Sequence, residues 1–436
     1  LAMAASIGVA VIIITNLIVV PMVLSYLGVS GASVRKIQAG EKKEHPLAGL
    51  FARFTRKPLA ALSIVIAVAG YGVGIYMSQD LKIGDLDKGA PELWPDPCEE
   101  MDCPRGYEPK PRYRYNHDVN FLVSNYSVSA DVLVVMGKTP VESCNTYPAM
   151  QTVDDLSWTL RNVEGVQDVV TISSATKLIS TNMNEGSLKW ATISRDQYAL
   201  NNVMSFMPDS LYNLDCSLAP VYVFLDDHKA DTLDGVVAAV TEFADEHNSE
   251  TLQFELAAGN AGVEAATNIV IREAQTKMLL WVYGVVIALC LINFRSLRIT
   301  TCIIVPLMLT SVLGQALMAA LGIGVKVATL PVIALGVGIG VDYGIYIYSS
   351  LQSYLRSGET LENAYFYALK SSGTAVAFTG LTLAVGVGTW MFSPIKFQAD
   401  MGLMLTFMFF WNMIGALLFL PALAWLLSPR EKAASA

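Results

Sequence analysis

An aspartate stands in the middle of an apolar run long enough to form a membrane helix. Asp342 lies within residues 328–348, a length that suffices to cross a hydrocarbon core of about 30 Å. A carboxylate at that depth is tolerated only beside a polar partner or a water-filled cavity, and such groups commonly carry protons. We therefore expect Asp342 to load and release a proton, although a structural aspartate held permanently by a salt bridge or by hydroxyl groups is the alternative. The side chains that could hydrogen-bond to it in one of two states are Tyr343, Tyr346, Thr379 and Thr382.

Glycines accompany the aspartate at helical spacing. Gly336, Gly340 and Gly344 recur every four residues and so form one smooth ridge, whereas Gly338 lies beside Asp342 on the opposite side. Small residues allow a second helix backbone to approach closely. Both sides of this helix therefore require protein neighbours, and we expect it at the centre of a helix bundle.

The composition indicates a membrane protein with a large soluble part. Of the 436 residues, 53% are hydrophobic and 15% are charged, which is too apolar for a soluble protein and too charged for membrane helices alone. Residues 78–275 carry 31 acidic and 13 basic side chains, whereas the rest of the chain carries 7 and 16. Because basic connections mark the cytoplasmic side of a membrane, the acidic stretch is expected outside.

Seven apolar runs of about 17 residues or more predict seven membrane-spanning helices. These runs are residues 5–27, 59–77, 278–294, 299–321, 328–348, 374–392 and 402–427. The first run starts at once, without the features of a signal peptide, so the chain is expected to be the latter part of a longer protein. The expected organisation is a membrane helix (1–28), a basic cytoplasmic linker (29–58), a second membrane helix (59–77), an external domain (78–275), a bundle of five membrane helices (276–428) and a cytoplasmic tail (429–436).

Alternating and helical periodicities within residues 78–275 predict two β-α-β units, and hence an external ferredoxin-like α+β domain. The expected strands are 128–136, 167–172, 221–225 and 252–257, with helices at 150–163 and 232–247. The Pro-rich residues 80–118 are expected to be irregular, and 188–214 to be helical. Large apolar side chains within residues 188–214 either face a substrate or belong to the core. They are Met204, Phe206, Met207 and Leu211.

Four cysteines fall in the expected external domain: Cys98, Cys103, Cys144 and Cys216. An even number in an oxidising compartment suggests two disulfides. We expect the pairs Cys98–Cys103 and Cys144–Cys216, although four cysteines allow three pairings. A metal site is the lesser alternative because no histidine cluster accompanies the cysteines, so neither a metal ion nor another cofactor is expected.

The arrangement resembles the RND superfamily of proton-driven transporters, and within it the MMPL and hopanoid-type branch. Residues 330–346 read L-P-V-I-A-L-G-V-G-I-G-V-D-Y-G-I-Y, and residues 259–266 read G-N-A-G-V-E-A-A. The likeness covers essentially the whole chain as the second half of such a transporter. It implies that the external stretch is a porter domain, that Asp342 lies on the proton path, and that a helix of the first half carries a matching acidic residue.

The resemblance also implies a function. We expect a secondary transporter, driven by the proton-motive force, that moves hydrophobic or lipid-like molecules across or out of a bacterial inner membrane, with its large domain in the periplasm. Expected partners are membrane lipids, a hydrophobic or amphiphilic substrate, further copies in a homo-oligomer (a trimer, or a dimer) and a periplasmic accessory protein. The external domain is too short for the docking insertion of the trimeric drug-efflux pumps, which places attachment to an outer-membrane channel in doubt.

Two other classes of function stay open. One is a Patched-like sterol or lipid receptor, and the other is a SecDF-like accessory that uses a proton path to drive protein export. The sequence contains no phosphate-binding loop and no motif of a hydrolase or metalloprotease, so the chain is not expected to be an enzyme. No nucleic-acid partner is expected.

Overall fold

The computed structural model describes residues 2–27, 46–90, 92–98, 106–126, 129 and 131–427. The chain divides into two units, Leu1–Leu50 and Phe51–Ala436. The first unit contains a long apolar helix, in which a π-helical turn, η1 (Thr15–Val19), joins α1 (Ala2–Ile14) to α2 (Val20–Leu27), and it also contains most of α4 (Pro46–Ala52). Most of the expected linker 29–58 and the whole of the expected tail 429–436 lie outside the described residues.

Seven helices in the described part of the chain are long and apolar enough to cross a membrane, which confirms the expected number. After the first comes α5 (Lys57–Ser78), which precedes the α+β domain, and then α11 (Asn260–Phe294), α12 (Leu297–Ala320) and α13 (Leu330–Arg356). The sixth runs through α14 (Leu361–Ala368), η5 (Leu369–Gly373), α15 (Thr374–Gly388) and η6 (Thr389–Phe392). The seventh runs through α16 (Lys396–Ile414), η7 (Gly415–Phe419) and α17 (Leu420–Leu427). Helix α13 packs against α11, α12, α14 and α16 and is therefore central among the helices of the second unit.

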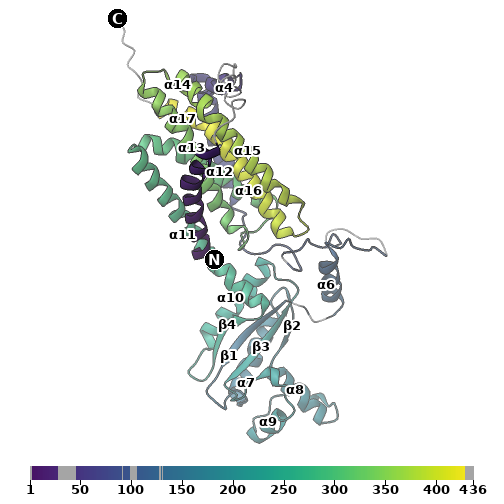
Figure 1. Cartoon of the computed structure of the whole chain (residues 1–436). Coiled ribbons are helices and arrows are strands. Elements are labelled where there is room, and N and C mark those ends of the chain that lie inside the picture. The colour runs from purple at the N-terminus through teal and green to yellow at the C-terminus, as the bar shows by residue number, and fades with distance from the viewer. Residues whose placement is uncertain are drawn as a thin grey trace. The chain divides into compact units, whose positions relative to one another are not determined.

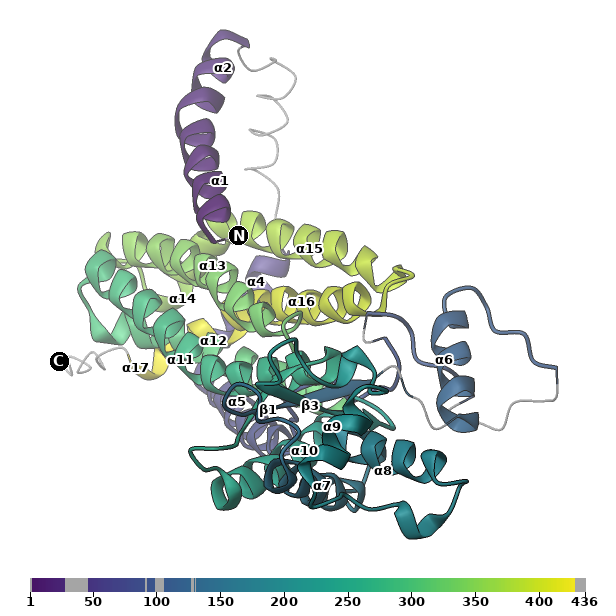
Figure 2. The same cartoon turned by 90° about the horizontal axis from the view of Figure 1, so that it is seen from below.

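A four-stranded antiparallel sheet forms the centre of the domain between α5 and α11 (Figures 1 and 2). Its elements follow in the order β1 (Val132–Lys138), α7 (Tyr147–Arg161), β2 (Val166–Val170), β3 (Leu218–Leu225), α10 (Ala230–His247) and β4 (Gln253–Ala258). The strand order is β2-β3-β1-β4, with Val135 opposite Val221 in the central pair. Both side chains are fully buried, because alternate residues of the strands face the core that α7 and α10 help to close.

The segment between β2 and β3 differs from the expectation in its first part. The strand ends at Val170, and α8 (Ile172–Met183) follows directly, although no helix was predicted there. The reason is a capping box, in which the Thr171 hydroxyl accepts from the Ser174 backbone N–H while the Ser174 hydroxyl accepts from the Thr171 N–H. Next come η3 (Leu188–Trp190), α9 (Gln197–Met204) and η4 (Asp209–Leu211), in the segment expected to be helical.

Two of the four apolar residues suggested as substrate-facing belong to the core. Met207 and Leu211 are 6% and 5% exposed and pack in the same cluster as the sheet, so of the two alternatives these residues take the core. Burial of these side chains against the core of the sheet stabilises the domain. Met204 is half-buried beside that core, whereas Phe206 is exposed.

One predicted disulfide lies within the described residues. Cys144 and Cys216 are joined, with their Cα atoms 5.1 Å apart, and the bond ties the start of α7 to the start of β3. Cys98 is also disulfide-bonded. Cys103 lies outside the described residues, so the pair Cys98–Cys103 stays a prediction.

Residues 80–90 and 92–98, which we call the strap, cross the domain-proximal ends of the membrane helices. Ile83 forms a parallel bridge with Val325 in the turn between α12 and α13, and the Gly84 N–H donates to the Val325 carbonyl oxygen at 2.9 Å. A Cβ atom at Gly324 would overlap the Gly84 carbonyl oxygen, so this approach requires glycine. Farther on, the Trp94 indole donates to the Ser393 carbonyl oxygen at 3.3 Å. The strap thus connects the turns that precede α13 and α16.

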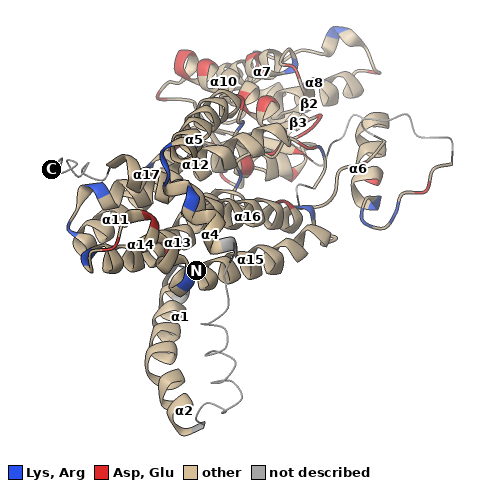
Figure 3. Cartoon of the chain, turned by 90° about the horizontal axis from the view of Figure 1, so that it is seen from above, with Lys and Arg blue, Asp and Glu red and all other residues tan. Residues whose placement is uncertain are grey.

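The distribution of charge follows the expected division. In Figure 3, acidic residues gather over the α+β domain around α7 and α10, whereas the long helices are largely free of charge. Beyond the strap, α6 (Arg114–Asn125) is held by Asn116, whose side chain accepts from the Ala90 N–H at 2.8 Å and donates to the Trp94 carbonyl oxygen at 2.9 Å.

Candidate functional site

The glycine ridge of α13 is packed as its spacing predicted. A Cβ atom at Gly336 would overlap the side chain of Met408 on α16. At Gly340 it would overlap Asn412 on α16 and come within 2.8 Å of Leu307 on α12. At Gly344 it would come within 2.9 Å of Ile303, also on α12. The ridge therefore lets two helices approach α13 at the same time.

A polar contact fixes the crossing of α13 and α16. Asn412 is 2% exposed, and its Nδ2 donates to the Gly336 carbonyl oxygen at 2.7 Å. Its Oδ1 has no hydrogen-bond partner in the described part of the chain, and the buried Tyr343 hydroxyl has none either. Buried polar atoms without partners are rare in folded proteins, so α16 and α13 each contribute one unused hydrogen-bonding atom, Asn412 Oδ1 and the Tyr343 hydroxyl.

The opposite face of α13 is not covered by the described residues of the second unit. Asp342 is exposed there, together with Tyr346 at 60% and Leu335 at 46% exposure. A Cβ atom at Gly338 would meet nothing within 4 Å. No hydrogen bond or ion pair to Asp342 is formed within residues 51–90, 92–98, 106–126 and 131–427.

The hydroxyl groups predicted to surround Asp342 are not brought to it. The Thr382 hydroxyl donates back to its own helix, to the carbonyl oxygens of Phe378 and Thr379, as threonines in membrane helices often do. Thr379 and Thr382 are exposed on α15. Helix α16 packs closely against both α13 and α15, which touch each other only slightly, and this arrangement keeps the threonines away from the aspartate.

A cavity of about 600 Å³ opens between the strap, the first part of α11, the turn before α13, and the starts of α13 and α16. Its lining combines apolar and charged side chains: Asp85, Glu92, Asn260, Val263, Glu264, Thr267, Asn268, Ile271, Lys326, Val327, Ala328, Pro331, Phe397 and Met401. Asp85 of the strap and Lys326 form an ion pair at 3.1 Å, with side chains only 4% and 14% exposed. The volume is within the range of ligand pockets.

A buried histidine lies beside this cavity. The His228 side chain, in the loop between β3 and α10, is 3% exposed, and its Nδ1 lies 3.1 Å from Asp131 Oδ2. Burial alone would lower the pKa of His228, because it disfavours the charged imidazolium. The hydrogen bond to Asp131 and the negative charges of Asp131, Glu264 and Asp85 favour the charged form more strongly. Together they raise the pKa of His228 to about 9. His228 Nε2 is buried without a hydrogen-bond partner in the described structure.

The sequence analysis did not identify this cluster. Its members are distributed over the strap, the start of β1, the β3–α10 loop and the first turn of α11, so no local spacing marks them. Glu264 alone lies within a motif noted from the sequence, at the variable position of G-N-A-G-V-E-A-A.

A second group of possible metal ligands is weaker. Asp96, Cys98 and His117 lie close together, and His117 Nδ1 is 3.1 Å from Asp96 Oδ2. Cys98 is disulfide-bonded, however, and a disulfide sulfur does not provide the thiolate that binds metal ions.

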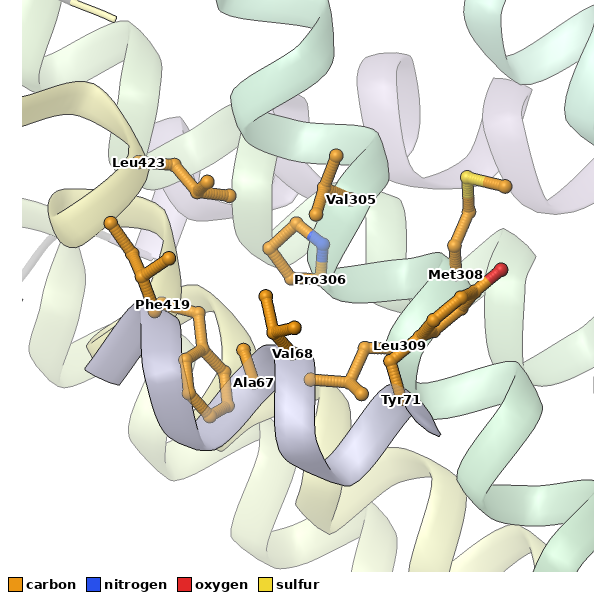
Figure 4. A pocket seen from close by; sticks show the side chains of 10 residues that line it. Ala67, Val68, Tyr71, Val305, Pro306, Met308, Leu309, Phe419 and Leu423 are labelled. Atoms are coloured by element: carbon orange, nitrogen blue, oxygen red, sulfur yellow. The ribbon is translucent and has the colours of Figure 1, made fainter. Parts of the chain in front are cut away.

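A separate apolar groove lies among the membrane helices. It has a volume of about 280 Å³ and lies between α5, α12 and the η7–α17 segment. Figure 4 shows Val68 and Tyr71 of α5 opposite Pro306 and Leu309 of α12. Its lining consists of Ile64, Ala67, Val68, Tyr71, Val305, Pro306, Met308, Leu309, Phe419 and Leu423, a surface suited to an alkyl chain or a ring system.

Comparison with known proteins assigns most of the chain to one family model. The model, described as the MMPL family, matches residues 127–436, which include the α+β domain and the five membrane helices that follow it. A protein described as a membrane protein from Methanocaldococcus jannaschii is 24% identical over 282 residues, covering 63% of this chain and 70% of the relative.

Proposed function

The chain belongs to the MMPL family, and from that premise we propose that it is part of an RND-type secondary transporter in which proton entry through Asp342 moves a hydrophobic or lipid-like molecule. The observation that carries this proposal is the asymmetry of α13. One face is locked to α12 and α16 through the glycine ridge, and the other presents a carboxylate at the centre of an apolar helix. Ionisable groups in such positions are functional by default.

In this proposal, further membrane helices of the transporter cover the Asp342 face. A carboxylate that exchanges protons must alternate between a neutral, desolvated state and a charged state with a polar partner. Tyr343, Tyr346, Thr379 and Thr382 contribute hydroxyl groups to one of these states after a change of packing. The unused hydroxyl of Tyr343 makes it the first of the four to test.

The α+β domain has the role of a porter domain in this proposal. The strand order β2-β3-β1-β4, with α7 and α10 between successive strands, supports a ferredoxin-like domain. The cavity beside Lys326 has both charged and apolar walls, as an amphiphilic molecule requires, and the groove in Figure 4 has apolar walls only. We propose the cavity for entry or release of the cargo.

We further propose a bacterial inner membrane as the location, with the α+β domain in the periplasm. The acidic α+β domain and the basic remainder of the chain support this orientation. A homo-oligomer and a periplasmic accessory protein complete the proposed assembly.

Proteoliposomes containing the full-length protein test the proposal. An imposed pH gradient should drive movement of a fluorescent lysophospholipid, and an uncoupler should abolish it. Asp342→Asn keeps the shape of the side chain but removes its titration, so it should reduce the proton-driven rate to that of protein-free vesicles. Asp155→Asn, on the exposed surface of α7, is the matched control and should transport normally.

Wild-type rates in Asp342→Asn would refute the proton role. If the wild-type protein binds the lysophospholipid equally with and without a gradient and never moves it, the Patched-like receptor is favoured. A SecDF-like function would instead appear as gradient-dependent protein export without lipid movement.

A further inference from the structure

Charged side chains from separate segments meet where the strap crosses the start of α11. Asp85 comes from the strap, His228 from the β3–α10 loop and Glu264 from the first turn of α11. Each offers one ligand atom, and these atoms all lie within 4.8 Å of one another. The neighbouring charges are Asp131, which is bonded to His228, and Lys326, which is paired with Asp85.

Without a metal ion, the charges of this cluster balance only when both His228 and Glu264 carry protons. Asp85, Asp131 and Glu264 contribute three negative charges when ionised, and Lys326 contributes one positive charge. With a neutral imidazole the cluster therefore carries a net charge of −2 in a largely buried place. Such an imbalance is costly unless it is neutralised, and one divalent cation would neutralise it completely.

The orientation of the histidine also points to a metal ion. In metal sites, the imidazole usually donates one N–H to a carboxylate and binds the metal through its other nitrogen. His228 Nδ1 lies 3.1 Å from Asp131, whereas Nε2 is buried and has no hydrogen-bond partner among the described residues. The nitrogen that a metal ion requires is therefore left free.

We propose that Asp85, His228 and Glu264 bind a divalent transition-metal ion, with Zn²⁺ as the representative, and that Asp131 orients the histidine. A mixed nitrogen and oxygen ligand set suits Zn²⁺ better than Ca²⁺ or Mg²⁺, which prefer oxygen alone. In a tetrahedral site with bonds of about 2.0–2.2 Å, ligand atoms lie about 3.3–3.6 Å apart. The observed upper limit of 4.8 Å requires only a small contraction around the ion.

The site would leave one coordination position open. Three protein ligands leave a fourth position for water or another ligand in a tetrahedral site. Asp85 and Glu264 also line the cavity beside Lys326, so the ion would belong to the cavity wall. It would also join the strap, the α+β domain and α11 at one point.

Zinc binding by the full-length protein, with affinity tags removed, tests this inference. The protein in detergent is stripped with EDTA and dialysed against Zn²⁺; elemental analysis should then give one ion per chain. Titration calorimetry should show at least about 100-fold weaker binding in His228→Gln, because a direct ligand is lost. Asp131→Asn should weaken binding about 10–100-fold, as loss of an orienting carboxylate does.

The matched control is His117→Gln, which removes the histidine of the second cluster beside Cys98 and should leave zinc binding unchanged. Glu264→Gln, which is isosteric and lies at the cavity wall, provides an independent test if His228→Gln does not fold. Size-exclusion chromatography of each variant establishes folding before titration.

Three results would overturn the inference: no bound zinc in the wild-type protein, unchanged affinity in Glu264→Gln, or tighter binding of Ca²⁺ or Mg²⁺ than of Zn²⁺. In the first case protons on His228 and Glu264, rather than a metal ion, balance the cluster. Because zinc binding needs no proton gradient, the result is independent of whether Asp342 drives transport.

Discussion

The side-chain amide of Asn412 donates a hydrogen bond to the backbone carbonyl oxygen of Gly336 across the contact between α16 and α13. It meets the helix on the ridge where glycines leave the backbone accessible. A shift of α16 along α13 would break this bond and leave further polar atoms unpaired in an apolar setting, which is costly. The contact therefore fixes the register of the two helices.

The ridge predicts different effects for two glycines on the same helix, Gly340 on the ridge and Gly338 away from it. Gly340→Ala should lower the apparent melting temperature, because its Cβ would overlap Asn412, and overpacking of this kind costs about 1–3 kcal/mol. Gly338→Ala meets open space and should be neutral or slightly stabilising. Fluorescence-detected size-exclusion chromatography after heating compares the two. Equal melting temperatures would contradict the packing role of the ridge.

The ion pair of the strap predicts a second contrast. Lys326→Met leaves Asp85 buried without its partner, which should cost about 3–5 kcal/mol and loosen the strap. Lys82→Met removes the partner of Asp231, but both side chains of that pair are more than half exposed, so the cost should be less than about 1 kcal/mol. Thermal unfolding in EDTA measures the loss of stability in each variant, and hydrogen exchange of the strap measures how far it loosens. Similar exchange in the two variants would show that the buried pair does not hold the strap.

The disulfide between Cys144 and Cys216 should stabilise the α+β domain by constraining the unfolded chain. The two cysteines are 72 residues apart, and closing a loop of that length contributes about 4 kcal/mol in the chain-entropy model. A reductant should therefore lower the unfolding temperature of the wild-type protein. The double variant Cys144→Ser/Cys216→Ser should already unfold at the lower temperature and should not respond to reductant. A response of the same size in the double variant would assign the effect to another disulfide.

The uncovered face of α13 predicts assembly in the membrane. Asp342 and Tyr346 lie on that face, and a carboxylate exposed to lipid would be unfavourable. Native mass spectrometry in mild detergent should show a trimer or a dimer. Monomers alone, at every protein concentration, would show that the cover comes from the same chain or from lipid.

The sequence predicts much of this fold because the strongest signals are local. Apolar length identifies the seven membrane helices, and a period of four places Gly336, Gly340 and Gly344 on one packed face. Helix α8 was not predicted because its start depends on the exchange of hydrogen bonds between Thr171 and Ser174, which apolar periodicity does not register.

The site could be predicted only where its parts are neighbours in sequence. Asp342 was identified from its own helix, but its distance from Thr379 and Thr382 depends on how α16 packs against α13 and α15. The burial of Met207 and Leu211 likewise depends on contacts with distant strands. The cluster of Asp85, His228 and Glu264 is the extreme case, because only the tertiary fold brings its three segments together.

The length of α11 has a mechanical consequence. It is one uninterrupted helix of 35 residues, from Asn260 at the α+β domain to Phe294 at the far end of the bundle, so it behaves as a rod about 50 Å long. It packs against α13 at one end and against β1, β4 and α10 at the other. A tilt of about 5° imposed at Phe294 displaces the opposite end of such a rod by about 4 Å. If α13 rocks, the rigid α11 would carry the movement to Glu264 and would change the width of the cavity mouth there without any hinge in the connecting helix.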